Sequence, residues 1–183
     1  AASDVYKRQG ITLHPPVAGV PNEDNLIFRA AAALGLPEDR GVAISIEKVI
    51  PMCGGLGGGS CNAAVTLLAL NDLFDLGYSV DELATKGAAL GADVPVFVRG
   101  TSAWAEGIGD ELMPLELPAC WFVIIYPDCH VSTQEIFGAP ELTRNTPPIT
   151  VSAFFEGPVR NDLQPVVESR YEQVSTAIKW LSN

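Results

Sequence analysis

The chain has 183 residues, 48% of them hydrophobic, and a formal net charge of −11 at pH 7. This length can bury a sizeable core, and it fits one domain or one domain with part of another. The acidic charge, with basic residues scattered along the chain, argues against nucleic acid or an anionic membrane as a partner. Because apolar runs are too short to span a bilayer and no secretion signal is recognisable, we expect a cytoplasmic protein.

The four cysteines show no pattern of a metal site or a disulfide framework. Cys53, Cys61, Cys120 and Cys129 form no Cys-x-x-Cys pair, and only two histidines are present. A chain of this size does not need disulfide bonds to fold. We therefore expect no metal ion held by cysteine.

The first predicted elements are a strand, a helix and a second strand. Residues 11–13 have the pattern of a short strand. Asp24 or Asn25 is the expected cap of a helix whose apolar residues recur over 26–34. Alternation of apolar and polar residues over 42–46 predicts a half-buried strand, which runs directly into a glycine-rich loop.

Two helices are predicted after this loop. The first is expected to begin at Ser60 and to continue through residues 63–70, whose apolar side chains cover much of its circumference and place it in the domain centre. The sequence Ser79-Val80-Asp81-Glu82 has the form of a capping box. It predicts a second helix that ends near Gly91.

Strands and short helices are predicted in the rest of the chain. Residues 102–106 have a strand pattern, and the apolar run 121–126, bounded by Pro118 and Pro127, has the form of a central strand. Prolines then divide the chain into short helices. Apolar residues spaced along 174–181 predict a last amphipathic helix.

Five glycines lie among residues 54–59, between the second predicted strand and the helix that follows. Glycine adopts positive φ without strain, so such a loop can turn its N–H groups inward. A helix N-terminus adds unpaired N–H groups and the positive end of the helix dipole. A flexible linker is the alternative, but linkers are usually polar on both sides. We therefore predict a phosphate-binding loop.

The spacing of the loop excludes two common phosphate-binding motifs. A P-loop needs a Gly-Lys pair, and no lysine lies between Lys48 and Lys86. The dinucleotide fingerprint needs a third glycine where this chain has Ser60 or Asn62. The His-Arg-Asp and Asp-Phe-Gly landmarks of protein kinases are also absent.

The remaining pattern, Pro-x-x-x-Gly-Leu-Gly-Gly-Gly-Ser-x-x-Ala-Ala, resembles the second motif of the GHMP kinases, the superfamily of galactokinase, homoserine kinase and mevalonate kinase. Within it, the chain is similar to the family of 4-diphosphocytidyl-2-C-methyl-D-erythritol kinases, ATP-dependent enzymes of the non-mevalonate isoprenoid pathway. The resemblance covers roughly residues 11–181. It is carried by residues 46–48, 54–60, 90–95, 105–109 and 140–147.

The resemblance implies an α+β fold, the GHMP kinase fold. Its N-terminal domain has a left-handed βαβ unit, like ribosomal protein S5 domain 2, and its C-terminal domain is ferredoxin-like. We expect the first over residues 10–113 and part of the second over 114–183. Residues 1–9 are expected to be an unrelated or artefactual leader. The family's opening lysine strand and closing glycine-rich motif have no counterpart here, so we expect a chain that lacks both ends.

The resemblance also assigns a nucleotide site and a catalytic group. Asp93 is the implied catalytic carboxylate, with ATP and Mg²⁺ as cofactors. Lys48 and Asn25 are implied near the nucleotide. The loop over the ATP phosphates comprises Gly54, Gly55, Leu56, Gly57, Gly58, Gly59 and Ser60.

The implied partner is a small molecule, 4-diphosphocytidyl-2-C-methyl-D-erythritol, which is phosphorylated on its 2-hydroxyl by a monomer or homodimer. Phe137 matches an aromatic residue that stacks on the cytosine, and Ser132 and Thr133 match positions that line the same pocket.

Other interpretations stay open for both residues and function. Asp93 is also a candidate helix cap, Phe137 a core residue and Lys48 a solvated lysine. Cys53 and Cys61 replace a glycine and a serine that are usual in the family's loop. The chain could be another GHMP kinase, a nucleotide-binding fragment without catalysis, or a fragment whose unpaired strand edge promotes association.

Overall fold

The computed structural model describes residues 10–17, 19–37, 40–47, 50, 54–107, 109 and 111–182. Helices and strands are both present, as expected for an α+β fold. The chain divides into two compact units between Pro118 and Ala119. Residue 114, where we expected the second domain to begin, is the last residue of a strand in the first unit.

The first unit opens with a strand, a helix and a strand. Strands β1 (Ile11–His14) and β2 (Val42–Ser45) pair in parallel, with Ile11 opposite Val42, and helix α1 (Leu26–Ala33) connects them. The 3-10 turn η2 (Asn22–Asp24) precedes α1. These elements confirm the predicted order.

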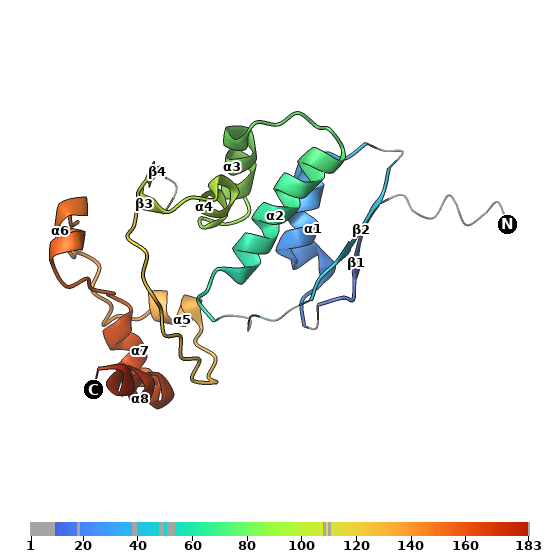
Figure 1. Ribbon diagram of the computed structural model, residues 1–183. Helices are drawn as coiled ribbons and strands as arrows, with labels where there is room; N and C mark the ends of the chain where they lie inside the picture. Colours follow the sequence, from blue (N-terminus) through green and yellow to red (C-terminus); the bar gives the residue numbers. More distant parts are fainter. Residues whose placement is uncertain are drawn as a thin grey trace. The chain divides into compact units, whose positions relative to one another are not determined.

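Helix α2 (Gly58–Leu73) packs against α1 through alanines. Ala30 and Ala31 of α1 and Ala63 and Ala64 of α2 have no exposed surface. Side chains this small allow two helix backbones to approach closely, and Figure 1 shows the two helices side by side. The apolar surface of α2 is less fully buried than predicted, since Val65 is 56% exposed.

The unit continues with two helices and a hairpin. Helices α3 (Val80–Ala88) and α4 (Val94–Arg99) pack against each other, and α4 also packs against α2. Strands β3 (Ala103–Glu106) and β4 (Glu111–Pro114) form an antiparallel pair. The strand predicted over 102–106 is therefore confirmed, whereas α4 was not predicted.

The capping box at the start of α3 is confirmed. The Ser79 hydroxyl accepts the N–H of Glu82, and the Glu82 carboxylate accepts the N–H and the hydroxyl of Ser79. These two hydrogen bonds to the carboxylate, the backbone one first, lower the pKa of Glu82 below its ordinary value of 4.5.

This capping box predicts an acid-sensitive contribution to stability. Because the pKa of Glu82 is lowered in the folded state, its stabilising effect is present at neutral pH and is lost as the pH falls through the folded-state value. We expect Glu82→Gln to lower the free energy of unfolding at neutral pH and to have little effect near about pH 3. Urea unfolding at both pH values measures this, and a difference independent of pH would contradict it.

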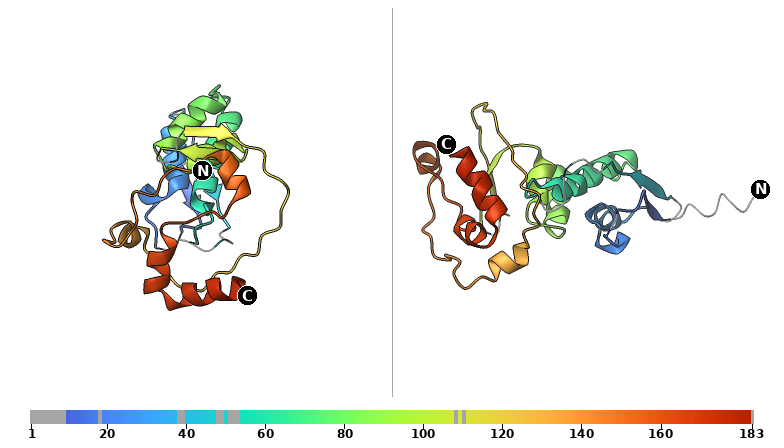
Figure 2. Two further views of the ribbon diagram at one scale, coloured as in Figure 1. Left: turned by 90° about the vertical axis from the view of Figure 1, so that its left-hand side faces the viewer. Right: turned by 90° about the horizontal axis from the view of Figure 1, so that it is seen from below.

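The second unit contains four helices in the described part of the chain: α5 (Thr133–Phe137), α6 (Val151–Glu156), α7 (Gln164–Arg170) and α8 (Glu172–Leu181). The chain bends sharply between α7 and α8 (Figure 2). Helix α8 confirms the predicted last helix. The small core of this unit is formed by Ile136, Ala139, Leu142 and Val166.

The strand predicted over residues 121–126 is absent, which corrects that prediction. The segment is an extended loop in Figures 1 and 2, and Trp121 is 101% and Phe122 80% exposed. A strand exists only when a neighbour accepts and donates its backbone hydrogen bonds. No described residue of the second unit supplies such a neighbour.

None of the helices formed by the described residues combines the length and apolar character that a membrane span requires.

Candidate active site

The glycine-rich loop, residues 54–60, enters α2 through residues in the left-handed region. Gly55 has φ +69°, and Gly57, the N-cap of α2, has φ +66°. Residues with a Cβ rarely adopt this conformation, so glycine is favoured at both positions. The helix begins at Gly58, two residues before the predicted Ser60, and the N–H of Cys61 donates to the Gly57 carbonyl over 2.8 Å.

The first turn of α2 presents backbone donors. The N–H groups of Gly58, Gly59 and Ser60 have no acceptor within the helix, and no side chain caps the helix start. These residues are half-buried, while Gly55 and Leu56 are exposed. The positive end of a 16-residue helix adds to the attraction of anions. The loop and helix start therefore have the chemistry to hold phosphate groups.

Asn25 lies beside this helix start. It lines a pocket of about 150 Å³ together with Gly59 and Asn62. Its side-chain oxygen accepts the N–H of Ile27 over 2.9 Å, so it caps α1, and the residue is only 8% exposed. The structure therefore brings Asn25 and the loop together, and the cap holds the Asn25 side chain in place.

Asp93 stands at the N-cap position of α4. Its side chain makes no hydrogen bond to the start of that helix, and the residue is exposed. The interpretation of Asp93 as a helix cap is therefore wrong. Its carboxylate is available for another role.

Helix α4 contacts the glycine-rich loop through Phe97. A Cβ added at Gly57 would lie 2.7 Å from Cζ of the Phe97 ring, so the ring occupies the space that a side chain there would need. Asp93 itself has helical backbone angles, φ −82° and ψ −14°. Because Asp93 and Phe97 are four residues apart, their side chains lie on the same face of the helix. This face is the one that meets the loop.

The residues on either side of Asp93 adjoin other segments of the first unit. Val94 is fully buried, and a Cβ at Gly87 of α3 would lie 2.8 Å from a Val94 methyl carbon. A Cβ at Gly109, in the turn between β3 and β4, would lie 3.8 Å from the Ala92 side chain. Sequence segments that are far apart along the chain thus meet around Asp93.

The predicted substrate residues lie together on α5 in the second unit. Ser132 caps this helix, since its side chain accepts the N–H of Glu135. Thr133 begins the helix and Phe137 ends it. Phe137 is 53% exposed, so it is not the core residue of the alternative interpretation. Its ring lines a pocket of about 530 Å³ that also contains Arg144.

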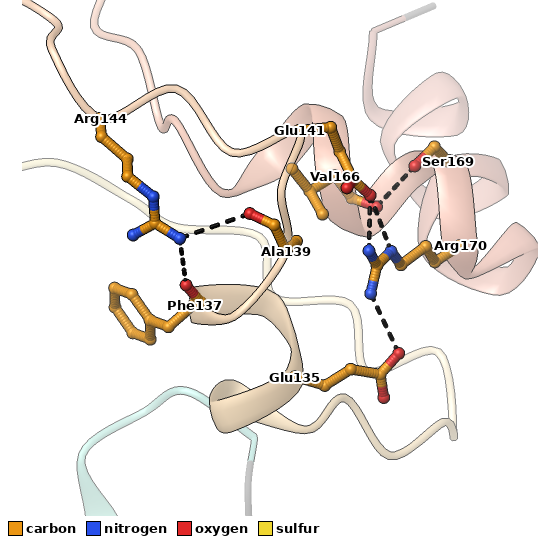
Figure 3. Close-up of polar contacts among 8 residues, drawn as sticks. All are labelled: Glu135, Phe137, Ala139, Glu141, Arg144, Val166, Ser169 and Arg170. Carbon is orange, nitrogen blue, oxygen red and sulfur yellow. Dashed lines mark hydrogen bonds and ion pairs between the residues drawn. The ribbon is translucent and has the colours of Figure 1, made fainter.

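Two arginines hold α5 and the segment after it (Figure 3). Arg144 donates to the carbonyl oxygens of Phe137 and Ala139. Arg170 of α7 donates to the Glu135 carboxylate over 3.1 Å and, over 3.0 and 2.6 Å, to the Glu141 carboxylate. A hydrogen bond from its own backbone and then the bond from Arg170 lower the pKa of Glu141.

Removing Arg170 is expected to loosen α5. Arg170→Ala removes both ion pairs, and we expect the amides of Ile136 and Gly138, which close this helix, to exchange hydrogen roughly two- to fivefold faster. Hydrogen exchange read by NMR measures this in the 183-residue chain. Arg160→Ala is the matched control, because Arg160 pairs with Asp162 and not with α5. Equal exchange in both variants would contradict the role of Arg170.

Lys48, the remaining predicted site residue, lies outside the described residues. Among the described residues, no three His, Cys, Asp or Glu side chains gather in a way that could hold a metal ion. The structure therefore collects the loop, Asn25 and Asp93 in the first unit, and Ser132, Thr133 and Phe137 in the second.

The family described as GHMP kinases N terminal domain matches residues 25–101, a range that contains the loop and Asp93. The 4-diphosphocytidyl-2-C-methyl-D-erythritol kinase of Marinobacter nauticus is 50% identical over 182 residues, which are 96% of this chain and 63% of the relative. The kinase of the same name from Pseudomonas fluorescens is 53% identical over 94% of this chain and 62% of its own length. Residues 25–101 of this chain therefore carry a GHMP kinase N-terminal domain.

A solved structure agrees with this assignment. It is a crystal structure of 4-(cytidine 5'-diphospho)-2C-methyl-D-erythritol kinase, 31% identical, with a TM-score of 0.72 over 92% of this chain and 64% of the other. The chain thus spans about three fifths of the length of the GHMP kinases that it matches.

Sequence reasoning did not find Phe97, Arg144 and Arg170. The signal for Phe97 was its place four residues after Asp93. This spacing puts the two side chains on one face only in a helix, and helix α4 was not predicted. Arg144 lies in segment 140–147, which carries part of the resemblance but gave it no role, and Arg170 lies in a segment without a distinctive pattern. Only the folded chain shows that they hold α5.

Proposed function

We propose that the chain forms the catalytic core of a kinase that transfers the γ-phosphoryl group of ATP to the 2-hydroxyl of 4-diphosphocytidyl-2-C-methyl-D-erythritol. The observation that carries this proposal is the placement of Asp93. Its carboxylate is exposed, does not cap its helix, and lies on the face of α4 that meets the glycine-rich loop. The names of relatives at about half identity support the substrate.

In this proposal the first unit positions the phosphates and the attacking hydroxyl. Backbone N–H groups of the loop and the start of α2 bind the phosphate oxygens and stabilise their charge. Asp93 accepts a hydrogen bond from the substrate hydroxyl, aligns its oxygen, and receives the proton as the oxygen attacks. Asn25 and Lys48 bind the nucleotide beside the loop.

The residues present fit ATP accompanied by Mg²⁺. No atom of the described residues lies within 4 Å of the place where a Cβ on Gly55 would be, so phosphate oxygens can approach the loop backbone there. Mg²⁺ bound to phosphates needs only one or two protein carboxylates, and Asp93 is an exposed carboxylate on the face of α4 that meets the loop. When bound, the ion neutralises charge on the transferred group.

In the second unit, α5 is proposed to bind the cytidine end of the substrate. The exposed Phe137 ring offers a flat apolar face for the cytosine. Thr133 is exposed at the helix start, and Ser132 keeps its hydroxyl next to it as the cap. Arg144 and Arg170 hold this helix, as described above.

The finer features of the fold are also proposals. The parallel unit β1-α1-β2 is proposed to be the left-handed βαβ element of the GHMP kinase N-terminal domain, and the second unit to be part of a ferredoxin-like domain. The protein is proposed to act in the cytoplasm as a monomer or homodimer. The likeness to a solved kinase whose title names the same substrate supports the proposed fold of the two units.

Activity is best tested in an extended chain, defined as this chain joined to the segments of the Marinobacter nauticus kinase that lie outside the aligned 182 residues. Release of ADP is measured with 4-diphosphocytidyl-2-C-methyl-D-erythritol, mevalonate, homoserine and galactose, and ³¹P NMR identifies the product. We expect a phosphate monoester from the first compound alone. Phosphorylation of only mevalonate or a sugar would overturn the proposed substrate, but the assignment as a small-molecule kinase would stand. Binding of an ATP analogue without transfer would favour a non-catalytic role.

A further inference from the structure

We propose that Phe97 is a positioning residue that sets the separation between the glycine-rich loop and Asp93. This inference rests on the proposed function, because it assigns the loop to the phosphates and Asp93 to the hydroxyl. Phe97 itself touches neither reacting group. It acts through the two elements that it holds apart.

The contact geometry supports this role. The Cζ and Cε2 atoms of the Phe97 ring lie 2.7 and 2.9 Å from the place where a Cβ on Gly57 would be. The para edge of the ring therefore points at the backbone of Gly57, the N-cap residue of α2. Gly57 is also the residue whose positive φ turns the loop into the helix. A change in ring size at position 97 is thus transmitted directly to the loop.

The adjacent, buried face of α4 is fixed, so such a change cannot be absorbed by a movement of the helix. Val94 and Val98 are buried in the core of the first unit, and Val94 fits against Gly87 of α3. Asp93 and Phe97 share the adjacent face, about 100° around the helix, and lie one helical turn apart. Because α4 is anchored by its valines, the ring determines how far the loop lies from the Asp93 carboxylate.

The role predicts different effects for a smaller and a longer side chain. Phe97→Leu removes ring volume and lets the loop move toward α4, which misaligns the phosphate with the hydroxyl that Asp93 holds. We expect kcat of the extended chain to fall roughly ten- to a hundredfold, with little change in the affinity for ATP. Phe97→Tyr adds an oxygen at Cζ, directed at Gly57, and pushes the loop outward. We expect it to weaken nucleotide binding roughly tenfold.

Phe74 provides the matched control. It is half-buried against the same core cluster, but it lies at the opposite end of α2 from the loop. Phe74→Leu should lower thermal stability about as much as Phe97→Leu and leave kcat per folded molecule unchanged. If Phe97→Leu also leaves kcat unchanged, Phe97 is an ordinary packing residue and the proposal is overturned.

Binding to the 183-residue chain separates this proposal from the proposed function. If the unsubstituted extended chain transfers no phosphoryl group, the proposed function fails. The positioning of the loop is then decided with a fluorescent ATP analogue and the 183-residue chain. Weaker binding of the ATP analogue by Phe97→Tyr but not by Phe74→Tyr supports the positioning role of Phe97. Equal affinity of the two variants overturns that role.

Discussion

The extended chain carrying Asp93→Asn is expected to lose phosphoryl transfer by about 10²- to 10⁴-fold, the contribution typical of a positioned general base. Asparagine keeps the size of aspartate and can still accept a hydrogen bond from the substrate hydroxyl. It cannot take up the proton. Because the Asp93 side chain makes no hydrogen bond to the start of α4, the substitution removes no cap and should leave folding intact.

Three measurements distinguish loss of chemistry from loss of structure in this variant. Initial rates of ADP release give kcat, binding of a fluorescent ATP analogue gives the nucleotide affinity, and thermal unfolding gives stability. Only kcat should fall. Asp72→Asn is the matched control, because Asp72 is an exposed aspartate near the C-terminal end of α2, away from the glycine-rich loop. An Asp93→Asn enzyme that retains most of the wild-type rate would rule out a catalytic role for this carboxylate.

The elements with strong local signals could be predicted from the sequence. The cap of α1 at Asn25, the capping box of α3 and the glycine-rich entry to α2 each depend on residues close together in the chain. Local hydrogen bonds and positive φ angles determine these features. The loop was therefore located correctly, although its helix begins two residues earlier than expected.

Features that depend on distant partners could not be predicted in this way. The apolar run 121–126 has high strand propensity, but propensity does not supply a neighbouring strand, and the segment is an extended loop here. Helix α4 is only six residues long, and its three valines favour strands in isolation. Its helical state follows from packing of Val94 and Val98 into the core.

The candidate site shows the same division. The sequence and its resemblance named Asp93 and the loop, but not how they are related in space. That relation depends on Phe97, whose contact with Gly57 joins residues forty positions apart. Two independent constraints favour glycine at position 57. One is its positive φ angle, and the other is the Phe97 ring beside it. The effects of these two constraints on stability can be separated by experiment.

Gly57→Ala is expected to destabilise the chain more than Gly77→Ala, although both glycines have positive φ, +66° and +75°. The positive φ alone costs an alanine about 1–2 kcal/mol at either position. At Gly77 no atom of the described residues lies within 4 Å of an added Cβ, whereas at Gly57 the Cβ would meet the Phe97 ring. This overpacking adds about 1–3 kcal/mol. Urea unfolding of the two variants of the 183-residue chain measures the difference.

Nucleotide binding and a double-mutant cycle show whether the Phe97 ring causes the larger effect expected of Gly57→Ala. Gly57→Ala should weaken binding of a fluorescent ATP analogue, because the methyl group displaces the loop from its phosphate-binding geometry, whereas Gly77→Ala should not. Combining Gly57→Ala with Phe97→Leu removes the atoms that collide, so the two free-energy changes should sum to more than the change in the double variant. Strict additivity would show that the ring moves aside without cost. The separation between the loop and Asp93 would then have to be set by the backbone alone.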